Sequence, residues 1–141
     1  MNVLVVGNGG REHAIARTLV QSDVVRRVFC VPGNGGTATL DRCQNMALRL
    51  DDFAGMARVA QTHGVALTIV GPEAPLAGGI TDFFEEKGLK VFGPSKLGAQ
   101  LEASKAWAKE LMAAAGIPTA RSAVFTEAEP AYAYAVSYTH L

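Results

Sequence analysis

Residues 3–13 read VLVVGNGGREH, so that a run of four aliphatic residues leads directly into a glycine-rich turn and then a segment of helical character. Aliphatic runs without polar alternation are typical of strands covered on both faces, as in a parallel sheet. Glycines, which have no Cβ, allow backbone N–H groups at a helix N-terminus to approach an anion closely. This stretch therefore predicts an α/β domain whose first strand-to-helix turn can bind a ligand.

Further short apolar runs follow along the chain. The predicted strands are Val3–Val6, Val28–Val31, Ala66–Val70 and Lys90–Phe92, with Asn45–Leu50 as a further candidate. Segments with helical spacing lie between them, and this alternation is the pattern of βαβ units. We therefore expect an open, mostly parallel sheet with helices on both faces, a Rossmann-like α/β fold.

Apolar spacing of three, four and seven residues predicts the helices. Arg11–Gln21 is expected to be a helix with Ile15 and Leu19 facing the sheet. Two amphipathic helices are expected from two apolar stripes, one of Phe53, Met56, Ala57 and Ala60 and one of Leu76, Ile80, Phe83 and Phe84. Asp51 or Asp52 is expected to cap the first of these, and Gly64 and Gly88 to follow helix ends.

The pattern changes after Phe92. One short helix is expected over Ser95–Leu101 and another after the capping residue Ser104, with Trp107, Leu111 and Ala114 on one face. Residues 116–118 (GIP) should end it. Ser122–Phe125 and Thr126–Tyr134 then read as a strand and a helix without partners.

Composition narrows the function class. Lys+Arg and Asp+Glu both number 13, so the surplus of positive charge that nucleic-acid binding requires is missing and no such partner is expected. No apolar stretch is long enough to cross a membrane, which favours a cytoplasmic protein without a membrane partner. Cys30 and Cys43 lack the spacing of a metal site and are interpreted as reduced thiols.

Two more loops follow predicted strands, residues 32–37 (PGNGGT) and 70–76 (VGPEAPL). In a parallel sheet these loops and the first turn emerge at the same carboxyl edge, where open α/β sheets bind ligands. Arg11 beside a helix N-terminus indicates either a bound anion or a salt bridge to Glu12 or another acid. Glu73, flanked by Pro72 and Pro75, can present a carboxylate in a fixed place, although a purely structural turn is the alternative.

A dinucleotide site is disfavoured by two departures from its fingerprint. That fingerprint requires a third glycine where Glu12 stands and an acidic residue after the second strand, where Pro32, Gly33 and Asn34 stand. Tight strand-to-helix packing is another interpretation of the first turn. No catalytic triad, catalytic residue or metal ligand is predicted, and His13 and His63 are interpreted as ordinary helix-surface residues.

Four motifs together resemble the glycinamide ribonucleotide synthetase family in order and spacing. They are residues 1–14 (MNVLVVGNGGREHA), 32–37 (PGNGGT), 67–76 (LTIVGPEAPL) and 92–105 (FGPSKLGAQLEASK). The similarity covers residues 1 to about 134. It implies an N-terminal α/β domain ahead of an ATP-grasp domain, and an ATP-driven ligase of purine biosynthesis. That ligase activates glycine as an acyl phosphate and joins it to 5-phosphoribosylamine, giving glycinamide ribonucleotide, ADP and phosphate, with Mg2+ accompanying ATP.

The resemblance also implies roles for particular residues. The first turn and the glutamate loop would hold the ribotide through Gly9, Gly10, Arg11 and Glu73, and Lys105 would contact ATP. The expected domains are an α/β (pre-ATP-grasp) domain over residues 1–102, a linker helix over residues 103–120, and a truncated start of the ATP-grasp domain over residues 121–141.

The family's later ATP-binding and magnesium-binding motifs do not occur in the 141 residues, so we expect this chain alone to be inactive. Residues 135–141 do not resemble the family and are expected to be non-native. Two alternatives stay open, a non-catalytic ribotide-binding module and an NAD-linked domain. No oligomeric state is predicted.

Overall fold

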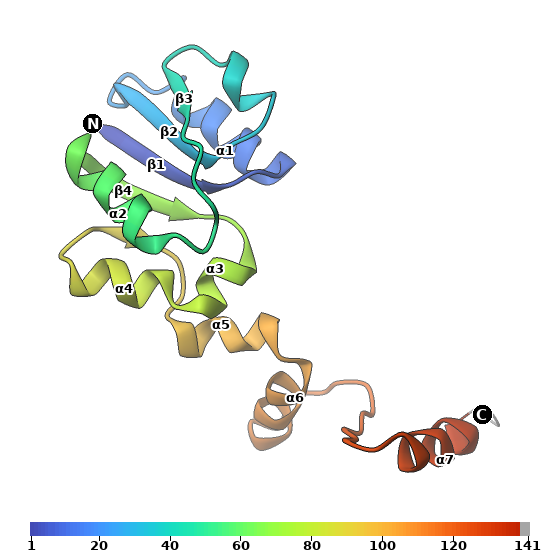
Figure 1. The fold of residues 1–141 in the computed structure, drawn as a ribbon. Helices are drawn as coiled ribbons and strands as arrows, with labels where there is room; N and C mark the ends of the chain where they lie inside the picture. The colour runs from blue at the N-terminus through green and yellow to red at the C-terminus, as the bar shows by residue number, and fades with distance from the viewer. Residues whose placement is uncertain (139–141) are drawn as a thin grey trace. The chain divides into compact units, whose positions relative to one another are not determined.

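The computed structural model describes residues 1–138 (Figure 1). The described chain divides into two compact units, Met1–Ala103 and a second unit that begins at Ser104. No helix among the described residues is long and apolar enough to cross a membrane.

Five strands in residues 1–138 form one sheet, and every neighbouring pair runs parallel. They are β1 (Asn2–Gly7), β2 (Arg27–Pro32), β3 (Cys43–Asn45), β4 (Val65–Val70) and β5 (Val91–Phe92). Their order across the sheet is β3-β2-β1-β4-β5. The chain winds outward from β1 to one side and then returns to the other, which places the topological switch point between β1 and β4. The predicted parallel α/β fold is confirmed.

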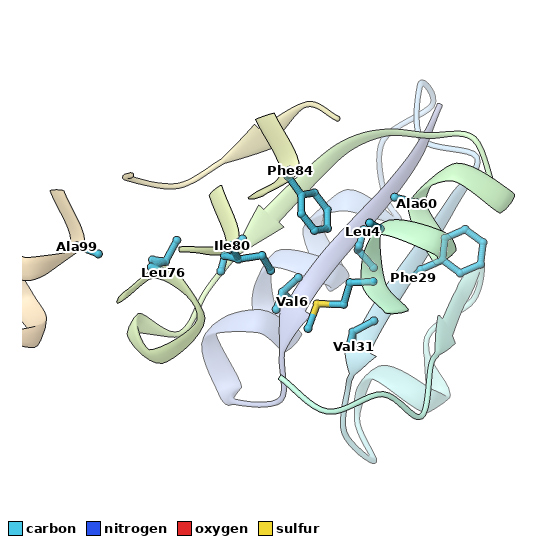
Figure 2. Close-up of a cluster of buried hydrophobic side chains, with 12 residues drawn as sticks. Leu4, Val6, Phe29, Val31, Ala60, Leu76, Ile80, Phe84 and Ala99 are labelled. Carbon is cyan, nitrogen blue, oxygen red and sulfur yellow. The ribbon is translucent and has the colours of Figure 1, made fainter. Parts of the chain in front are cut away.

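Helices cover both faces of this sheet, because side chains alternate between the faces along each strand. Val3 and Val5 of β1 pack with Ala16 of α1 (Gly10–Leu19), and Ile15 and Leu19 lie against the same cluster as predicted. The other face is the larger core, shown in Figure 2. There Leu4 and Val6 pack with side chains of α2 (Phe53–Thr62), α3 (Glu73–Gly78), α4 (Ile80–Glu86) and α5 (Lys96–Ala103).

Several helices begin or end at the capping residues and glycines that the sequence predicts. Asp52 caps α2, because its Oδ1 accepts the N–H of Gly55 at 2.8 Å. Gly64 and Gly88 follow the ends of α2 and α4 with positive φ. Ser104 caps α6 (Lys105–Ala114), where its hydroxyl accepts the N–H of Trp107 at 3.3 Å.

The single amphipathic helix expected from the Leu76–Phe84 stripe is wrong, since the chain forms α3 and α4 with a break at Gly79. Gly79 has φ of 94°, a left-handed conformation that glycine adopts without steric cost. The break redirects the chain while Leu76, Ile80 and Phe84 stay in one core (Figure 2). The apolar spacing therefore shows that these residues belong to one core, but it does not show that they lie on one continuous helix.

The candidate strand Asn45–Leu50 is also wrong, because the strand next to β2 is β3 and it ends at Asn45. Met46, Leu48 and Leu50 are partly buried against the core, while the residues between them are exposed. This alternation imitates a strand, but it arises from packing of an irregular segment on the sheet.

The second unit contains α6 and α7 (Ala128–Tyr138). Trp107, expected on one face of this helix, is partly buried, and Ala108 is the buried residue of α6. The strand predicted over Ser122–Phe125 does not form; all of its residues are exposed. A strand without sheet partners is marginal in water, which accounts for this difference. Residues 139–141 of the expected non-native tail lie outside the described part of the chain.

Candidate functional site

Three loops meet at the carboxyl edge of the sheet, as the parallel arrangement predicts. β1 ends at Gly7, which is level with Pro32 at the end of β2, and Val6 is level with Val70 of β4. The loops that follow β2 and β4 are hydrogen-bonded to the last two residues of β1. Gly33 N–H donates to the Gly7 carbonyl at 3.2 Å, and Gly71 N–H donates to the Val6 carbonyl at 3.0 Å.

Glu12 is buried at the centre of this edge, with 4% of its surface exposed. Its carboxylate accepts the N–H of Gly9 at 2.8 Å and the Nε–H of Arg11 at 2.9 Å. A Cβ on Gly7, Gly9 or Gly71 would overlap this carboxyl group. The three glycines therefore make room for a glutamate, and the carboxylate occupies the anion-accepting end of α1.

This arrangement explains the departure from the dinucleotide fingerprint. In the sequence, Glu12 stands where the fingerprint requires a glycine and is a possible partner of Arg11, but the folding of its side chain back into the turn was not predicted. The available signal was its spacing, because a glutamate three residues after an N-cap position commonly bonds back to the N-cap N–H.

Arg11 pairs with Glu12, one of the two possibilities that the sequence left open. The pKa of Arg11 lies above its usual value, first because of the hydrogen bond to Glu12 and further because of the negative charges of Glu12, Glu73 and Glu102. Burial opposes ionisation of Glu12, but the bonds from Arg11 and Gly9 outweigh it and hold the pKa of Glu12 below its usual value. The Arg11 side chain remains 59% exposed, so its terminal nitrogens face solvent.

Glu73 lies on the neighbouring loop in a different setting from the one expected. It is the first residue of α3 and not part of an extended loop, with Pro72 as the N-cap. Pro75 fits in the first helical turn because N–H groups there have no partner inside the helix. The exposed Glu73 carboxylate is close enough to influence Arg11, so the structure brings these two predicted residues to the same sheet edge.

Gly9 and Gly10 have separate roles in the turn. The Gly9 N–H is taken by Glu12, whereas Gly10 is the first residue of α1 and its N–H has no partner inside that helix. A Cβ on Gly10 would meet no atom within 4 Å, so the space above it is open. A shallow hollow begins at Gly10 and continues along the outer face of α1 past His13.

Lys105 lies in the second unit as the first residue of α6, where it is exposed. Among the described residues no cluster of three His, Cys, Asp or Glu side chains could hold a metal ion. The described residues therefore do not fit a magnesium site by themselves.

The two cysteines belong to the scaffold. Both are free, as interpreted from the sequence, with 3.5 Å between their sulfur atoms. Burial raises the pKa of the Cys30 thiol to about 12, which keeps it protonated and unreactive at neutral pH.

Fold and site together define a doubly wound α/β domain whose first turn is closed by an internal carboxylate in place of a dinucleotide phosphate. Residues 1–102 match the family described as phosphoribosylglycinamide synthetase, N domain. The chain belongs to this family, and the resemblance found in the sequence is confirmed.

Two relatives named phosphoribosylamine–glycine ligase support this assignment. The chain is 66% identical over 134 residues to the phosphoribosylamine–glycine ligase of Nostoc sp., covering 95% of this chain and 32% of the relative. It is 50% identical over 135 residues to the ligase of Synechocystis sp., covering 96% and 32%. The chain thus spans about a third of the length of the curated relatives it matches.

Solved structures show the same fold at low sequence identity. The biotin carboxylase domain of Hydrogenobacter thermophilus 2-oxoglutarate carboxylase has a TM-score of 0.70 at 21% identity, covering 96% of this chain and 32% of that one. The structure titled glycinamide-RNase-transformylase T from Mycobacterium tuberculosis has a TM-score of 0.67 at 16% identity, covering 97% and 38%. These similarities establish the architecture alone.

Proposed function

We propose that this chain supplies the N-terminal part of a phosphoribosylamine–glycine ligase and that its α/β unit contributes part of the ribotide site. The observation that carries the proposal is the 66% identity over 134 residues to a relative of that name. The reaction joins the carboxyl carbon of glycine to the amine of 5-phosphoribosylamine. ATP drives it and leaves as ADP and phosphate.

The geometry supports the carboxyl edge of the sheet as the location of the ribotide. Gly10 offers a backbone N–H that has no partner inside α1, and Arg11 offers guanidinium N–H groups that remain exposed after pairing with Glu12. A guanidinium and an N-terminal helix N–H are suited to a phosphate group. We assign these two groups to the phosphate end of the ribotide, and we assign Gly9 to the same site as the residue whose N–H holds the Glu12 carboxylate in the turn.

Glu73 is assigned to the other end of the ribotide. Its carboxylate can accept a hydrogen bond from a ribose hydroxyl or from the reacting amine, and α3 holds its backbone in one conformation. ATP is assigned to Lys105 and, with Mg2+ and glycine, to the portion of the longer relatives that this chain does not match. The chain alone is therefore expected to be inactive, and a cytoplasmic location stays a prediction.

The alternative of an NAD-linked domain is disfavoured by Glu12. Its buried carboxylate stands in place of the third glycine of the dinucleotide fingerprint and takes the Gly9 N–H, which is then not free for a dinucleotide pyrophosphate. A non-catalytic ribotide-binding module differs from the proposal only in lacking turnover, which the next experiment measures.

The test is a hybrid enzyme in which residues 1–134 replace the matching segment of the Nostoc sp. ligase. Phosphoribosylamine can be formed in solution from ribose 5-phosphate and ammonia. We expect ADP release that requires both glycine and phosphoribosylamine, whereas the 141-residue chain alone should release none. A folded hybrid without glycine-dependent ADP release would contradict the proposal.

A further inference from the structure

Asn34 connects two loops at the candidate site, and no sequence motif assigned it a role. Its Nδ2 donates to the carbonyl oxygens of Asn8 at 3.0 Å and Gly9 at 3.2 Å. Its Oδ1 accepts the N–H of Thr37 at 2.9 Å. An amide bonded at both ends is held in one orientation, so Asn34 fixes the β1–α1 turn from the loop that follows β2.

The loop that carries Asn34 is itself held by a closed polar network. Thr37 is 1% exposed, and its hydroxyl accepts the Asn34 N–H at 2.8 Å. The same hydroxyl lies 2.7 Å from Oδ1 of Asn45, whose Nδ2 donates to the Asn34 carbonyl at 2.8 Å. A network in which each polar group has a partner is rigid, because breaking one bond leaves a buried group unpaired.

Contacts on both sides of Asn34 keep the two loops at a constant spacing. Gly33 donates its N–H to the Gly7 carbonyl at 3.2 Å. The imidazole of His13 lies so close to Gly36 that a Cβ there would overlap the ring. Asn34 is therefore the central member of a set of contacts between the loop and the turn, and it is the member whose side chain bonds the carbonyl groups of Asn8 and Gly9.

We propose that Asn34 is a positioning residue for ribotide binding. Asn34 bonds the carbonyl oxygen of Asn8 and adds a second donor to the Gly9 carbonyl, which already accepts the His13 N–H at 3.1 Å. It thereby keeps these partial negative charges from the ligand and holds the Gly10 N–H and the Arg11 side chain in place. If the turn could rotate, its carbonyl oxygens could face the phosphate, and these negative groups would repel each other. The inference rests on the proposed function, since it assumes that the ribotide binds at Gly10 and Arg11.

The test is Asn34→Asp in the hybrid enzyme. Aspartate keeps the acceptor for the Thr37 N–H but replaces the Nδ2 donor with an oxygen that faces two carbonyl groups. We expect the KM for phosphoribosylamine to rise on the order of tenfold, with the KM values for glycine and ATP unchanged. Asn34→Ala, which adds no charge, should raise the same KM. Gln44→Glu makes the same amide-to-carboxylate change at an exposed position of β3 and should raise none.

Arg11→Ala separates failure of this inference from failure of the proposed function. If Arg11→Ala leaves the KM for phosphoribosylamine unchanged, the proposed site is wrong and the inference falls with it. If Arg11→Ala raises that KM but neither Asn34 variant does, the positioning role alone is wrong. A rise in all three KM values together with a lower melting temperature would show that Asn34 serves folding only.

Discussion

The carboxyl group of Glu12 lies directly against Gly71, so the first residue after β4 touches a side chain that begins on α1. The contact joins the two loops on either side of the topological switch point. It is possible because Gly71 has no Cβ, and it ties the integrity of the turn to a residue 59 positions further along the sequence.

We predict that Gly71→Ala destabilises the α/β unit. A methyl group at this position would overlap the buried Glu12 carboxyl, and overpacking of this kind costs about 1–3 kcal/mol. Urea unfolding of the 141-residue chain measures the change in free energy. Gly35→Ala is the matched control, because a Cβ on Gly35 meets no atom within 4 Å. Equal stability of the two variants would show that Glu12 does not occupy this position.

Glu12→Gln tests how much the two hydrogen bonds to the Glu12 carboxylate stabilise the fold. The amide can accept only one of the two hydrogen bonds, so we expect a loss of about 1–3 kcal/mol at pH 7. The folded-state pKa of Glu12 lies below its ordinary value of 4.5, so its contribution is complete above that pH and is lost as the pH falls through the lower folded-state pKa. The stability difference between the wild type and Glu12→Gln should therefore shrink in acid. A difference independent of pH would contradict an ionised Glu12.

Glu73→Gln in the hybrid enzyme tests the assignment to the ribosylamine. The substitution keeps the shape of the side chain and removes its charge, so turnover should fall if the carboxylate orients a hydroxyl or the reacting amine. Glu86→Gln, an equivalent change at an exposed position of α4, is the control and should not alter turnover. If Glu73→Gln turns over at the wild-type rate, Glu73 does not orient the ribosylamine and the start of α3 has a structural role only.

Protection of backbone amides from hydrogen exchange should be strong in the sheet and weak in the segment that follows Pro118. Val3–Val6 and Ala66–Val70 lie in strands bonded on both sides, so their amides should be strongly protected. Residues 119–130 are all exposed and contain no strand, so little protection is expected there. Protection at Ser122–Phe125 equal to that of β1 would show that this segment has a partner.

Four of the five strands in the described sheet, all except β3, and several helix ends could be predicted because their causes are local. Val3–Val6 is apolar without interruption, and Asp52 and Ser104 are capping residues next to amphipathic segments. The break at Gly79 could not be predicted from apolar spacing, because Leu76 and Ile80 keep their contacts with the core on both sides of it. Periodicity reports which residues face the core but does not report whether the helix between them is continuous.

The meeting of the three loops at the site could likewise be predicted, because it follows from parallel strands alone. The side-chain contacts within it could not. The position of the Glu12 side chain requires that Gly71 has no Cβ. The Asn34 side chain is held by carbonyl groups of a turn about 25 residues earlier in the sequence. Such contacts between residues distant in sequence leave no periodic signal, so only the folded arrangement shows that Glu12 lies against Gly71 and that Asn34 is hydrogen-bonded to the turn.

The KM for phosphoribosylamine in the Arg11→Ala hybrid enzyme tests the central claim most directly. Removing the guanidinium should raise this KM on the order of tenfold or more, because charge-assisted bonds to phosphate are among the stronger contacts, and should leave the KM values for glycine and ATP unchanged. Arg58→Ala on α2, an exposed arginine on the opposite face of the sheet from α1, should change none of them. An unchanged KM for phosphoribosylamine in Arg11→Ala would contradict a ribotide site at this edge of the sheet.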